Sequence, residues 1–342
     1  MKKDLLISPL AATVLLCAAL LIGCDSGTSR GGSAGVSSVG TEPPPPQHST
    51  WKIATTTGMV TDIVRHVVGS HGKVTGLMEA GVDPHLFKPT RGHVKLLNDS
   101  DVVFYSGLKL EGRMSETFEQ LSRTGKPVFA VTAGIDAASL RTPPEFEDHH
   151  DPHVWMDVSL WSQCIEHISD SLAKFDPPHA DDYHKNAVAY REELNQLDEY
   201  VKKSIASIPK SQRVLVTAHD AFGYFSKAYE IEVKSVQGVS TESEAGVRDV
   251  NQLVDFLVER KLPAIFVESS VNAKNIQAVI EGAASHNVTV RVGGELFSDA
   301  MGAEGTYEGT YIGMIDHNAT LITRALGGDA PEKGLNGKLE AK

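Results

Sequence analysis

Residues 177–209 read PPHADDYHKNAVAYREELNQLDEYVKKSIASIP, a long and highly charged stretch near the middle of the 342-residue chain. Its apolar residues recur with the period of an α-helix, namely Tyr183, Ala187, Tyr190, Leu194, Leu197 and Val201. Pro177 and Pro178 are placed to begin a helix, and Pro209 is placed to end it. The pattern predicts one amphipathic helix, which is either an ordinary surface helix or a strut that joins two lobes.

On either side of this helix, short apolar strands alternate with amphipathic helices. The expected strands are 51–57, 73–78, 101–106 and 127–131 before it, and 213–217, 232–236, 264–268 and 289–292 after it. Such alternation favours parallel sheets covered on both faces, so the predicted fold class is α/β, with two lobes that each hold a small parallel sheet flanked by helices. The expected segments are an N-terminal lobe (51–176), the linking helix (177–209), a C-terminal lobe (210–328) and a tail (329–342).

The N-terminus has the pattern of an export signal. Lys2 and Lys3 precede a mostly apolar run, which ends in Leu21-Ile22-Gly23-Cys24. These four residues resemble the bacterial lipobox, in which the cysteine is lipidated after cleavage; an uncleaved anchor helix is the alternative. We therefore expect a lipoprotein signal peptide at 1–24, a flexible tether rich in Ser, Gly and Pro at 25–50, and an extracytoplasmic body anchored through Cys24 on the periplasmic side or at the cell surface.

Composition narrows the classes of partner. The chain has 32 Lys and Arg against 44 Asp and Glu, which gives a formal net charge of -12. An acidic chain disfavours nucleic acid, because affinity for phosphate backbones comes mainly from Lys and Arg. Cys164 is the one cysteine after residue 24, so the body has neither an internal disulfide nor a thiolate metal site.

Four polar residues follow predicted strands and are candidates for a metal site. They are His85, His153, His219 and Asp299. The first two each complete an Asp-Pro-His tripeptide, in which Asp-Pro favours a turn. Ligands of open α/β sheets bind beyond the carboxyl ends of the strands, and three neutral imidazoles with one carboxylate suit a divalent first-row metal. Taken singly, each histidine could equally cap a helix or pack in a loop, and Asp299 could be an N-cap.

Together with their neighbours these residues form a recognisable set of motifs. The motifs are Gly81-Val82-Asp83-Pro84-His85, Asp151-Pro152-His153-Val154-Trp155-Met156-Asp157, Thr217-Ala218-His219-Asp220, Phe266-Val267-Glu268-Ser269-Ser270 and Phe297-Ser298-Asp299. The chain resembles the metal-binding solute-binding proteins of ABC transporters, in their zinc and manganese branch (cluster 9, or A-I). The resemblance covers the body from Trp51 to about Leu326.

The resemblance implies two lobes joined by one long rigid helix, with one transported ion between them. It implies His85, His153, His219 and Asp299 as the ligands, Zn²⁺ or Mn²⁺ as the ion with Fe²⁺ as a third candidate, and delivery by a monomer to an ABC permease in the inner membrane. In this family zinc proteins often carry a long His-rich loop, where this chain has only His149 and His150. The sequence therefore does not choose between zinc and manganese.

Some neighbouring residues are candidates for supporting roles. Asp83, Asp151 and Asp220 could accept hydrogen bonds that orient the imidazoles, or could serve turns and helix caps instead. Glu242, with the nearby Glu244 and Arg248, resembles family loop residues that brace the cleft or face the permease.

Two other functional classes, metallohydrolases and surface adhesins, predict different sequence features. A metallohydrolase keeps an open coordination position and a general base, whereas four protein ligands close this shell and the chain has no His-Glu-x-x-His motif. Its one Gly-x-Ser-x-Gly match, at 31–35, lies in the expected tether and has no strand before it. A surface adhesin would share the anchor and the tether but would not need a closed metal site. The sequence thus predicts a binding protein and not an enzyme.

Overall fold

The computed structural model describes residues 50–146 and 149–340 of the chain. In the N-terminal half, four parallel strands form one sheet in the order β2-β1-β3-β4. The strands are β1 (Trp51–Thr55), β2 (Gly72–Gly76), β3 (Val102–Tyr105) and β4 (Val128–Ala130). The expected signal peptide, Cys24 and the expected tether up to residue 49 lie outside the described residues.

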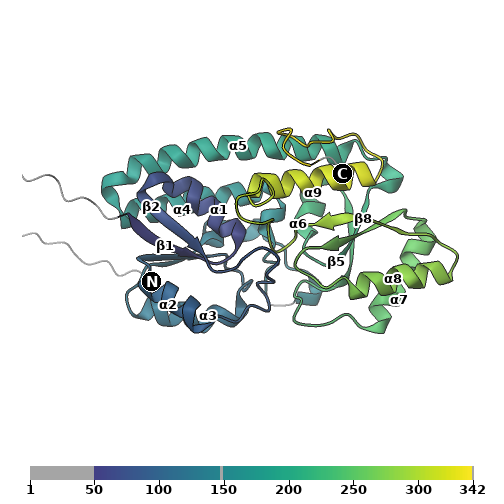
Figure 1. Ribbon diagram of the computed structural model, residues 1–342, viewed down its shortest axis with the longest axis horizontal. Helices are drawn as coiled ribbons and strands as arrows, with labels where there is room; N and C mark the ends of the chain where they lie inside the picture. Colours follow the sequence, from purple (N-terminus) through teal and green to yellow (C-terminus); the bar gives the residue numbers. More distant parts are fainter. Residues whose placement is uncertain (1–49, 147–148, 341–342) are drawn as a thin grey trace, which may run out of the picture. The chain divides into compact units, whose positions relative to one another are not determined.

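Helices cover both faces of this sheet, because successive residues of a strand point to opposite sides. Ile53, Val102 and Phe104 face one apolar core, while Ala54 and Val103 face another. Figure 1 shows helices on both sides of the sheet. The first core is covered by α1 (Gly58–Val68) and α4 (Val158–Phe175), the second by α2 (Arg91–Asp99) and α3 (Ser115–Arg123).

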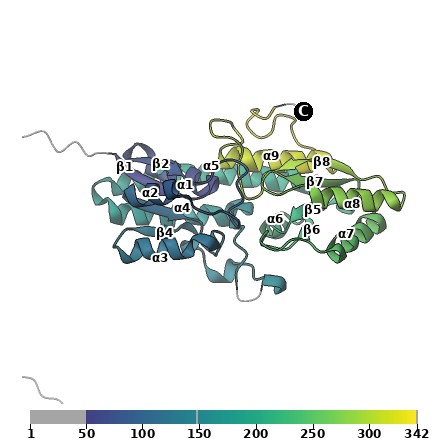
Figure 2. The same ribbon diagram turned by 60° about the horizontal axis from the view of Figure 1, so that its bottom comes forward.

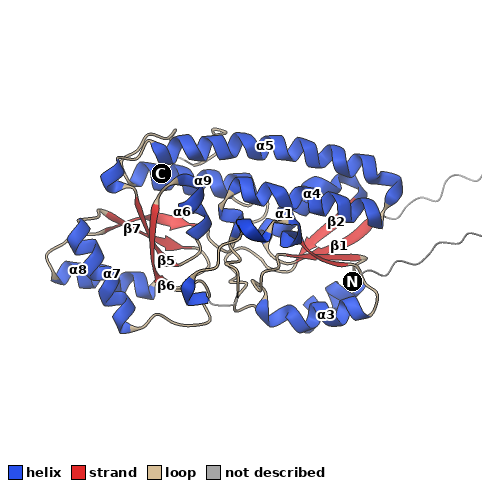
Figure 3. Ribbon diagram, turned by 180° about the vertical axis from the view of Figure 1, so that it is seen from behind, coloured by secondary structure: helices blue, strands red, loops and turns tan. Residues whose placement is uncertain are grey.

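The predicted long helix is α5 (Ala180–Ala206), which has 27 residues and therefore a length of about 40 Å. A 3-10 turn, Pro177–His179, leads into it. Its buried face holds the apolar residues that the sequence pattern singled out, namely Tyr183, Ala187, Tyr190, Leu194, Leu197 and Val201. Figure 3 shows α5 lying along α4 at one end and along α9 (Tyr311–Ala325) at the other. Because α5 packs on both halves of the chain, it is a strut and not an ordinary surface helix.

The C-terminal half contains two parallel pairs of strands, β5-β6 and β7-β8, and β5 lies beside β7. The strands are β5 (Val214–His219), β6 (Glu232–Gln237), β7 (Ala264–Glu268) and β8 (Arg291–Leu296). Figure 2 shows α7 and α8 on one side of these strands, with α6 and α9 on the other. The remaining helices are α6 (Gly223–Tyr229), α7 (Val247–Arg260) and α8 (Lys274–Ser285). The α/β alternation predicted from the sequence is thus confirmed in both halves.

The last strand departs from the expected range of 289–292. It begins at Arg291 and continues through Gly293 and Gly294 to Leu296. A register shift between Ile265 and Phe266 of β7 accommodates the glycines, and Gly294 has a φ of 142°. A Cβ atom on Gly293 would lie 2.7 Å from the Phe266 ring, so a strand that looks interrupted in sequence is packed closely in the fold.

One apolar core runs through both halves. It includes residues of α1 and α4 together with residues of α5, α6 and α9. Two buried hydrogen bonds join the halves near its centre: Trp155 donates its indole N–H to the Ser298 carbonyl over 2.9 Å, and the Tyr311 hydroxyl donates to the Trp155 carbonyl over 2.7 Å. The strands of the two halves therefore share one core.

Short 3-10 turns and the C-terminal tail complete the described structure. The other 3-10 turns are Gly69–His71, Gly112–Met114, Val131–Gly134, Ala137–Ser139, Pro144–Phe146, Val154–Met156 and Lys210–Gln212. The tail folds back on α9, where the Leu335 N–H donates to the Asp316 carboxylate over 2.9 Å. Within residues 50–146 and 149–340, no helix is both long and apolar enough to cross a membrane.

Candidate metal centre

The four predicted ligands each follow a strand or precede a helix. His85 lies in the loop between β2 and α2, which we call the His85 loop (residues 77–90). His153 comes just before the Val154–Met156 turn that leads into α4, His219 is the last residue of β5, and Asp299 follows β8. Because the carboxyl ends of both sets of strands face the middle of the molecule, these side chains can meet there.

The Asp-Pro-His tripeptides set the local backbone at two of the ligands. The Asp83 carboxylate accepts the N–H of His85 over 2.8 Å, and the Asp151 carboxylate accepts the N–H of His153 over 3.0 Å. In each case an aspartate binds the backbone two residues further on, which is the Asx turn that such sequences favour. The repeated motif therefore builds the same turn at both histidines.

The ligand atoms of the four residues all lie within 4.8 Å of one another. The Nε2 atoms of His85 and His153 are 3.3 Å apart, and the nearest Asp299 oxygens lie 3.5 Å from His85, 3.3 Å from His153 and 3.1 Å from His219. Bonds of about 2.1 Å to a tetrahedral ion would place the ligand atoms about 3.4 Å apart. The observed spacing therefore fits one small divalent ion.

The burial of these four residues also supports a site for one divalent ion. His85 is 5% exposed, Asp299 is 1% exposed, and His153 and His219 are fully buried. Among the described residues, both Asp299 carboxylate oxygens and Nε2 of His219 have no hydrogen-bond partner. Buried polar atoms without partners are costly, and a metal ion at their centre would satisfy all of them.

Buried carboxylates orient two of the imidazoles. Nδ1 of His153 donates to Asp151 over 2.8 Å, and Nδ1 of His219 donates to Glu268 over 2.5 Å. Glu268 also accepts the backbone N–H groups of Ala218 and His219 over 2.7 and 2.9 Å. Since Nδ1 carries the proton in each bond, Nε2 is the atom left to bind an ion, as in carboxylate–histidine–metal triads.

A further layer fixes Asp151. The Arg141 guanidinium forms an ion pair with its carboxylate, and the Tyr224 hydroxyl donates to its carbonyl over 2.9 Å. A Cβ on Gly223 would overlap the Arg141 guanidinium, so a larger residue there would push that side chain away from Asp151. Arg141 and Tyr224 come from opposite halves of the chain, and both therefore help to fix His153.

The charges of the site are strongly coupled. Burial lowers the pKa of His85 to about 3, which keeps its imidazole neutral. Burial also disfavours charge on His153, but Asp299 and Asp151 outweigh it and raise the pKa of His153 to about 9. For Asp299, burial is likewise outweighed by His219 and His153, which lower its pKa well below the usual range. An incoming divalent ion must therefore displace protons from the imidazoles of His153 and His219, whose pKa values are raised.

A cavity of about 440 Å³ reaches Asp299 from the surface. Its wall includes the carboxylates of Asp62, Glu79 and Glu304, which favour the approach of a cation. Arg65 on α1 forms an exposed ion pair of 2.7 Å with Glu304, and so it connects the two halves at the edge of this cavity. Among the described residues that line the cavity, Asp299 is the one member of the four candidate ligands.

The family model described as "Zinc-uptake complex component A periplasmic" (ZnuA) matches residues 53–325. The chain belongs to this family. It is 47% identical over 275 residues to the manganese-binding lipoprotein MntA of Bacillus subtilis, covering 80% of this chain and 89% of that protein. It is 46% identical over 274 residues to the zinc-binding protein TroA of Treponema pallidum, covering 80% and 88%.

A solved structure of a family member has the same fold. The periplasmic zinc-binding protein TroA from Treponema pallidum superimposes with a TM-score of 0.78 and 45% sequence identity, over 81% of this chain and 99% of that one. The membership of this family that the sequence motifs predicted is thus confirmed, and so is the α/β fold with its long joining helix.

The structure brings all four predicted ligands together but corrects part of the predicted surroundings. Of the two roles expected for the neighbouring aspartates, Asp151 orients the His153 imidazole and also serves the turn, whereas Asp83 serves the turn at His85. The imidazole of His219 is oriented by Glu268, a role that the sequence did not assign to it. Glu268 is 49 residues from His219, and its signals in the sequence are its place at the end of a predicted strand and in the Phe266–Ser270 motif.

His149 and His150 do not join the metal centre. Nε2 of His149 lies 2.8 Å from Nζ of Lys109, and Nδ1 of His150 lies 3.0 Å from the Thr142 hydroxyl. The group of potential ligands found among the described residues contains neither of them.

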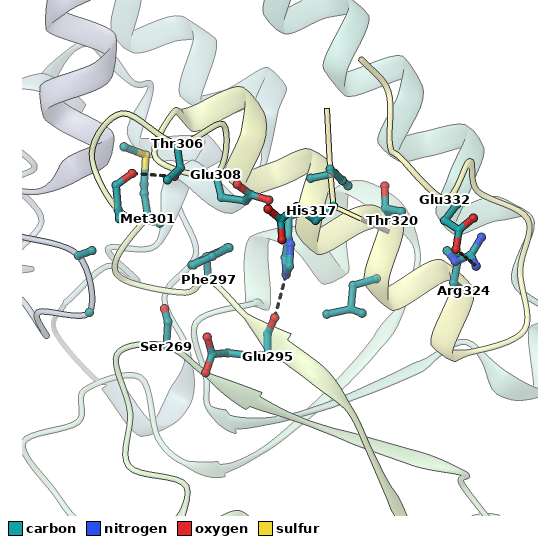
Figure 4. Close-up of a pocket in the computed structure, with 17 residues that line it drawn as sticks. Ser269, Glu295, Phe297, Met301, Thr306, Glu308, His317, Thr320, Arg324 and Glu332 are labelled. Carbon is teal, nitrogen blue, oxygen red and sulfur yellow. Dashed lines mark hydrogen bonds and ion pairs between the residues drawn. The ribbon is translucent and has the colours of Figure 1, made fainter. Parts of the chain in front are cut away.

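A cavity of about 490 Å³ lies next to α9 (Figure 4). His317 points from α9 toward β8, where its Nε2 lies 2.9 Å from the Glu295 carbonyl oxygen. Arg324 faces Glu332 across 3.9 Å. The described residues that line this cavity include none of the four ligands, so it is separate from the metal centre.

Proposed function

We propose that this protein captures one divalent transition-metal ion, Mn²⁺ or Zn²⁺, and delivers it to an ABC permease. The observation that carries the proposal is the convergence of three imidazoles and one carboxylate, from both halves of the chain, at the spacing of a single ion. His85, His153, His219 and Asp299 are the proposed ligands. Relatives of nearly equal similarity are named as manganese-binding and as zinc-binding proteins, so similarity does not choose the metal.

The donor set accepts either ion. Imidazole and carboxylate groups bind zinc well, and intrinsic affinity is lowest for manganese among the divalent first-row metals. Selection of manganese would therefore depend on metal supply and on the permease. Fe²⁺ remains a third candidate on the same chemistry.

Capture explains the closed shell better than catalysis does. Four protein ligands complete a tetrahedral ion, whereas hydrolytic zinc sites keep a position for water. We therefore propose a transport role without catalysis. The carrier would act as a monomer, held on the outer side of the membrane by a lipid at Cys24, with residues 51–176 and 210–328 as its two lobes.

Calorimetric titration of the full chain, purified in detergent and stripped of metal, tests the proposal. Zn²⁺ and Mn²⁺ are titrated separately into the parent and into His219→Ala. We expect one ion per chain and an affinity more than about 100-fold weaker in the variant, since loss of a ligand costs at least as much as loss of an outer-shell partner. His286→Ala, at the C-terminal end of α8, is the matched control and should bind as the parent does. Failure of both metals to bind stoichiometrically would overturn the proposal in favour of a surface adhesin.

A further inference from the structure

His85 is the ligand with the least support of its own. The rings of His153 and His219 are each bonded to a buried carboxylate through Nδ1. In residues 50–146 and 149–340, no side chain is hydrogen-bonded to Nδ1 of His85. His85 also lies on a loop, and it is the most exposed of the four ligands. Its position over the ion therefore depends on what holds the His85 loop.

Two adjacent residues of the opposite half hold that loop. The Thr241 hydroxyl donates to Asp83 Oδ2 over 2.6 Å, while Oδ1 of the same carboxylate accepts the His85 N–H. Glu242 accepts a hydrogen bond from Arg113 Nε over 2.9 Å, and Arg113 also reaches the Leu86 carbonyl at 3.5 Å. The two contacts thus end at residues on either side of His85.

Both residues belong to the loop of residues 238–246, between β6 and α7, which we call the clasp. The clasp begins beside another ligand, because Gln237 pairs with His219 in the β5-β6 ladder and the Gly238 carbonyl accepts the N–H of Asp220. It therefore spans the site from the His219 side to the His85 side. The clasp thus connects His219, a ligand from the C-terminal half, with His85, a ligand from the N-terminal half.

The clasp borders a cavity on the side of β6 and α7, where the Gln237 side chain donates to the Ser243 carbonyl over 3.2 Å. This cavity of about 680 Å³ lies between the clasp and the β6 and α7 elements, and is lined by Gly238, Ser243 and Glu244 of the clasp. Figure 2 shows β6 and α7, whose residues line this cavity together with the clasp. The side chain of Glu242 is 52% exposed, and Ser243 and Glu244 are also exposed. A docking partner can therefore reach the exposed part of the clasp directly, while Val239 and Thr241 of the clasp are buried.

We infer that residues 238–246 act as a release clasp, in which Thr241 and Glu242 are positioning residues that hold His85 over the bound ion and limit its escape. The inference rests on the proposed metal-binding function. Release of the ion requires a ligand to leave, and His85 can leave once the Thr241–Asp83 and Glu242–Arg113 contacts break. Thr241 is buried and bonds a carboxylate, so it contributes more than the exposed Glu242–Arg113 pair.

The test measures the rate at which the full chain releases Zn²⁺ to an excess of chelator in a stopped-flow instrument. Thr241→Val keeps the shape of the side chain but removes its hydroxyl, and Thr241→Ser keeps the hydroxyl. We expect release about tenfold faster for Thr241→Val and about two- to threefold faster for Glu242→Gln, with Thr241→Ser within about twofold of the parent. The melting temperature of metal-free Thr241→Val should fall by no more than about 5 °C, the cost of one hydrogen bond to a carboxylate, whereas a general loss of packing would lower it further.

Release from Thr241→Val at the parental rate, or equally fast release from Thr241→Ser, would overturn the clasp. If Thr241→Val fails to fold, the rates of Zn²⁺ release from the exposed variants Glu242→Gln and Arg113→Gln test the clasp instead. Faster release from both, with no further gain in the double variant, supports the clasp, and parental rates contradict it. If the parent itself binds no Zn²⁺ or Mn²⁺, the proposed function fails. If the parent binds but the variants release normally, the clasp alone fails.

Discussion

At the scale of single residues, two of the proposed ligands are oriented by the buried carboxylates of Asp151 and Glu268, which are not ligands themselves in the proposed site. Glu268 accepts three hydrogen bonds, from Nδ1 of His219 and from the N–H groups of Ala218 and His219. It therefore fixes both the tautomer of the imidazole and the backbone that carries it. Burial disfavours charge on His219, but Glu268 and Asp299 outweigh this and raise the pKa of that imidazole.

We predict that Glu268→Gln weakens metal binding by about 10- to 100-fold, because the uncharged amide orients the imidazole less firmly and makes it a poorer ligand. Calorimetric titration of the metal-free full chain measures the change. Glu281→Gln is the matched control, because Glu281 is exposed on α8 and bonds only Gln277 in the described structure. Parental affinity in Glu268→Gln would show that His219 is positioned by its strand alone.

At the scale of secondary-structure elements, α5 is tied to each half of the chain by a tyrosine. The Tyr190 hydroxyl donates to the Asp62 carboxylate on α1 over 2.6 Å, and the Tyr200 hydroxyl lies 2.6 Å from the Thr320 hydroxyl on α9. His66 stacks on the Tyr190 ring at 3.8 Å. The two bonds differ in that the first ends on a buried carboxylate and the second on a neutral hydroxyl.

This difference predicts unequal costs for two conservative substitutions. Tyr190→Phe should lower the free energy of unfolding by about 1.5–3 kcal/mol, because it leaves the buried Asp62 carboxylate without this donor. Tyr200→Phe should lower it by about 0.5–1.5 kcal/mol, since the lost bond joins two neutral groups. Denaturant unfolding of the metal-free variants measures both values. Equal effects, or a larger effect of Tyr200→Phe, would contradict the role assigned to the charge on Asp62.

The sequence predicts the secondary-structure elements, and the turns at two of the proposed ligands, because both are local. Period and proline placement locate α5, and the repeated Asp-Pro-His tripeptide marks the turns at His85 and His153. The contacts that support the site are not local: Glu268 is 49 residues from His219, and Thr241 is 158 residues from Asp83. No periodicity encodes such pairs, because the packing of the two halves creates them. The predicted range of β8 was wrong at its glycines for a similar reason, since the groups beside Gly293 and Gly294 are the Phe266 ring of β7 and the Leu321 side chain of α9.

At the scale of the whole molecule, the two halves form one packed body, and their interface differs between the shared core and the metal centre. They share an apolar core, α5 packs on both, and the Trp155–Ser298 and Tyr311–Trp155 hydrogen bonds are buried between them. A wide hinge opening would expose that core and break those bonds. The interface is different at the metal centre, where the two halves meet through the His85 loop and the clasp.

We therefore predict that loading and removal of the ion change the fold only slightly. Crystal structures of the metal-loaded and the chelator-stripped protein, superimposed on the N-terminal sheet, should agree within about 2 Å at Cα, with larger shifts confined to the His85 loop and the clasp. The reason is energetic, because a packed core resists continuous deformation while loops joined by a few hydrogen bonds do not. A rotation of the C-terminal half as a rigid unit would contradict this prediction, and it would mean that the ion and not the shared core holds the two halves in place.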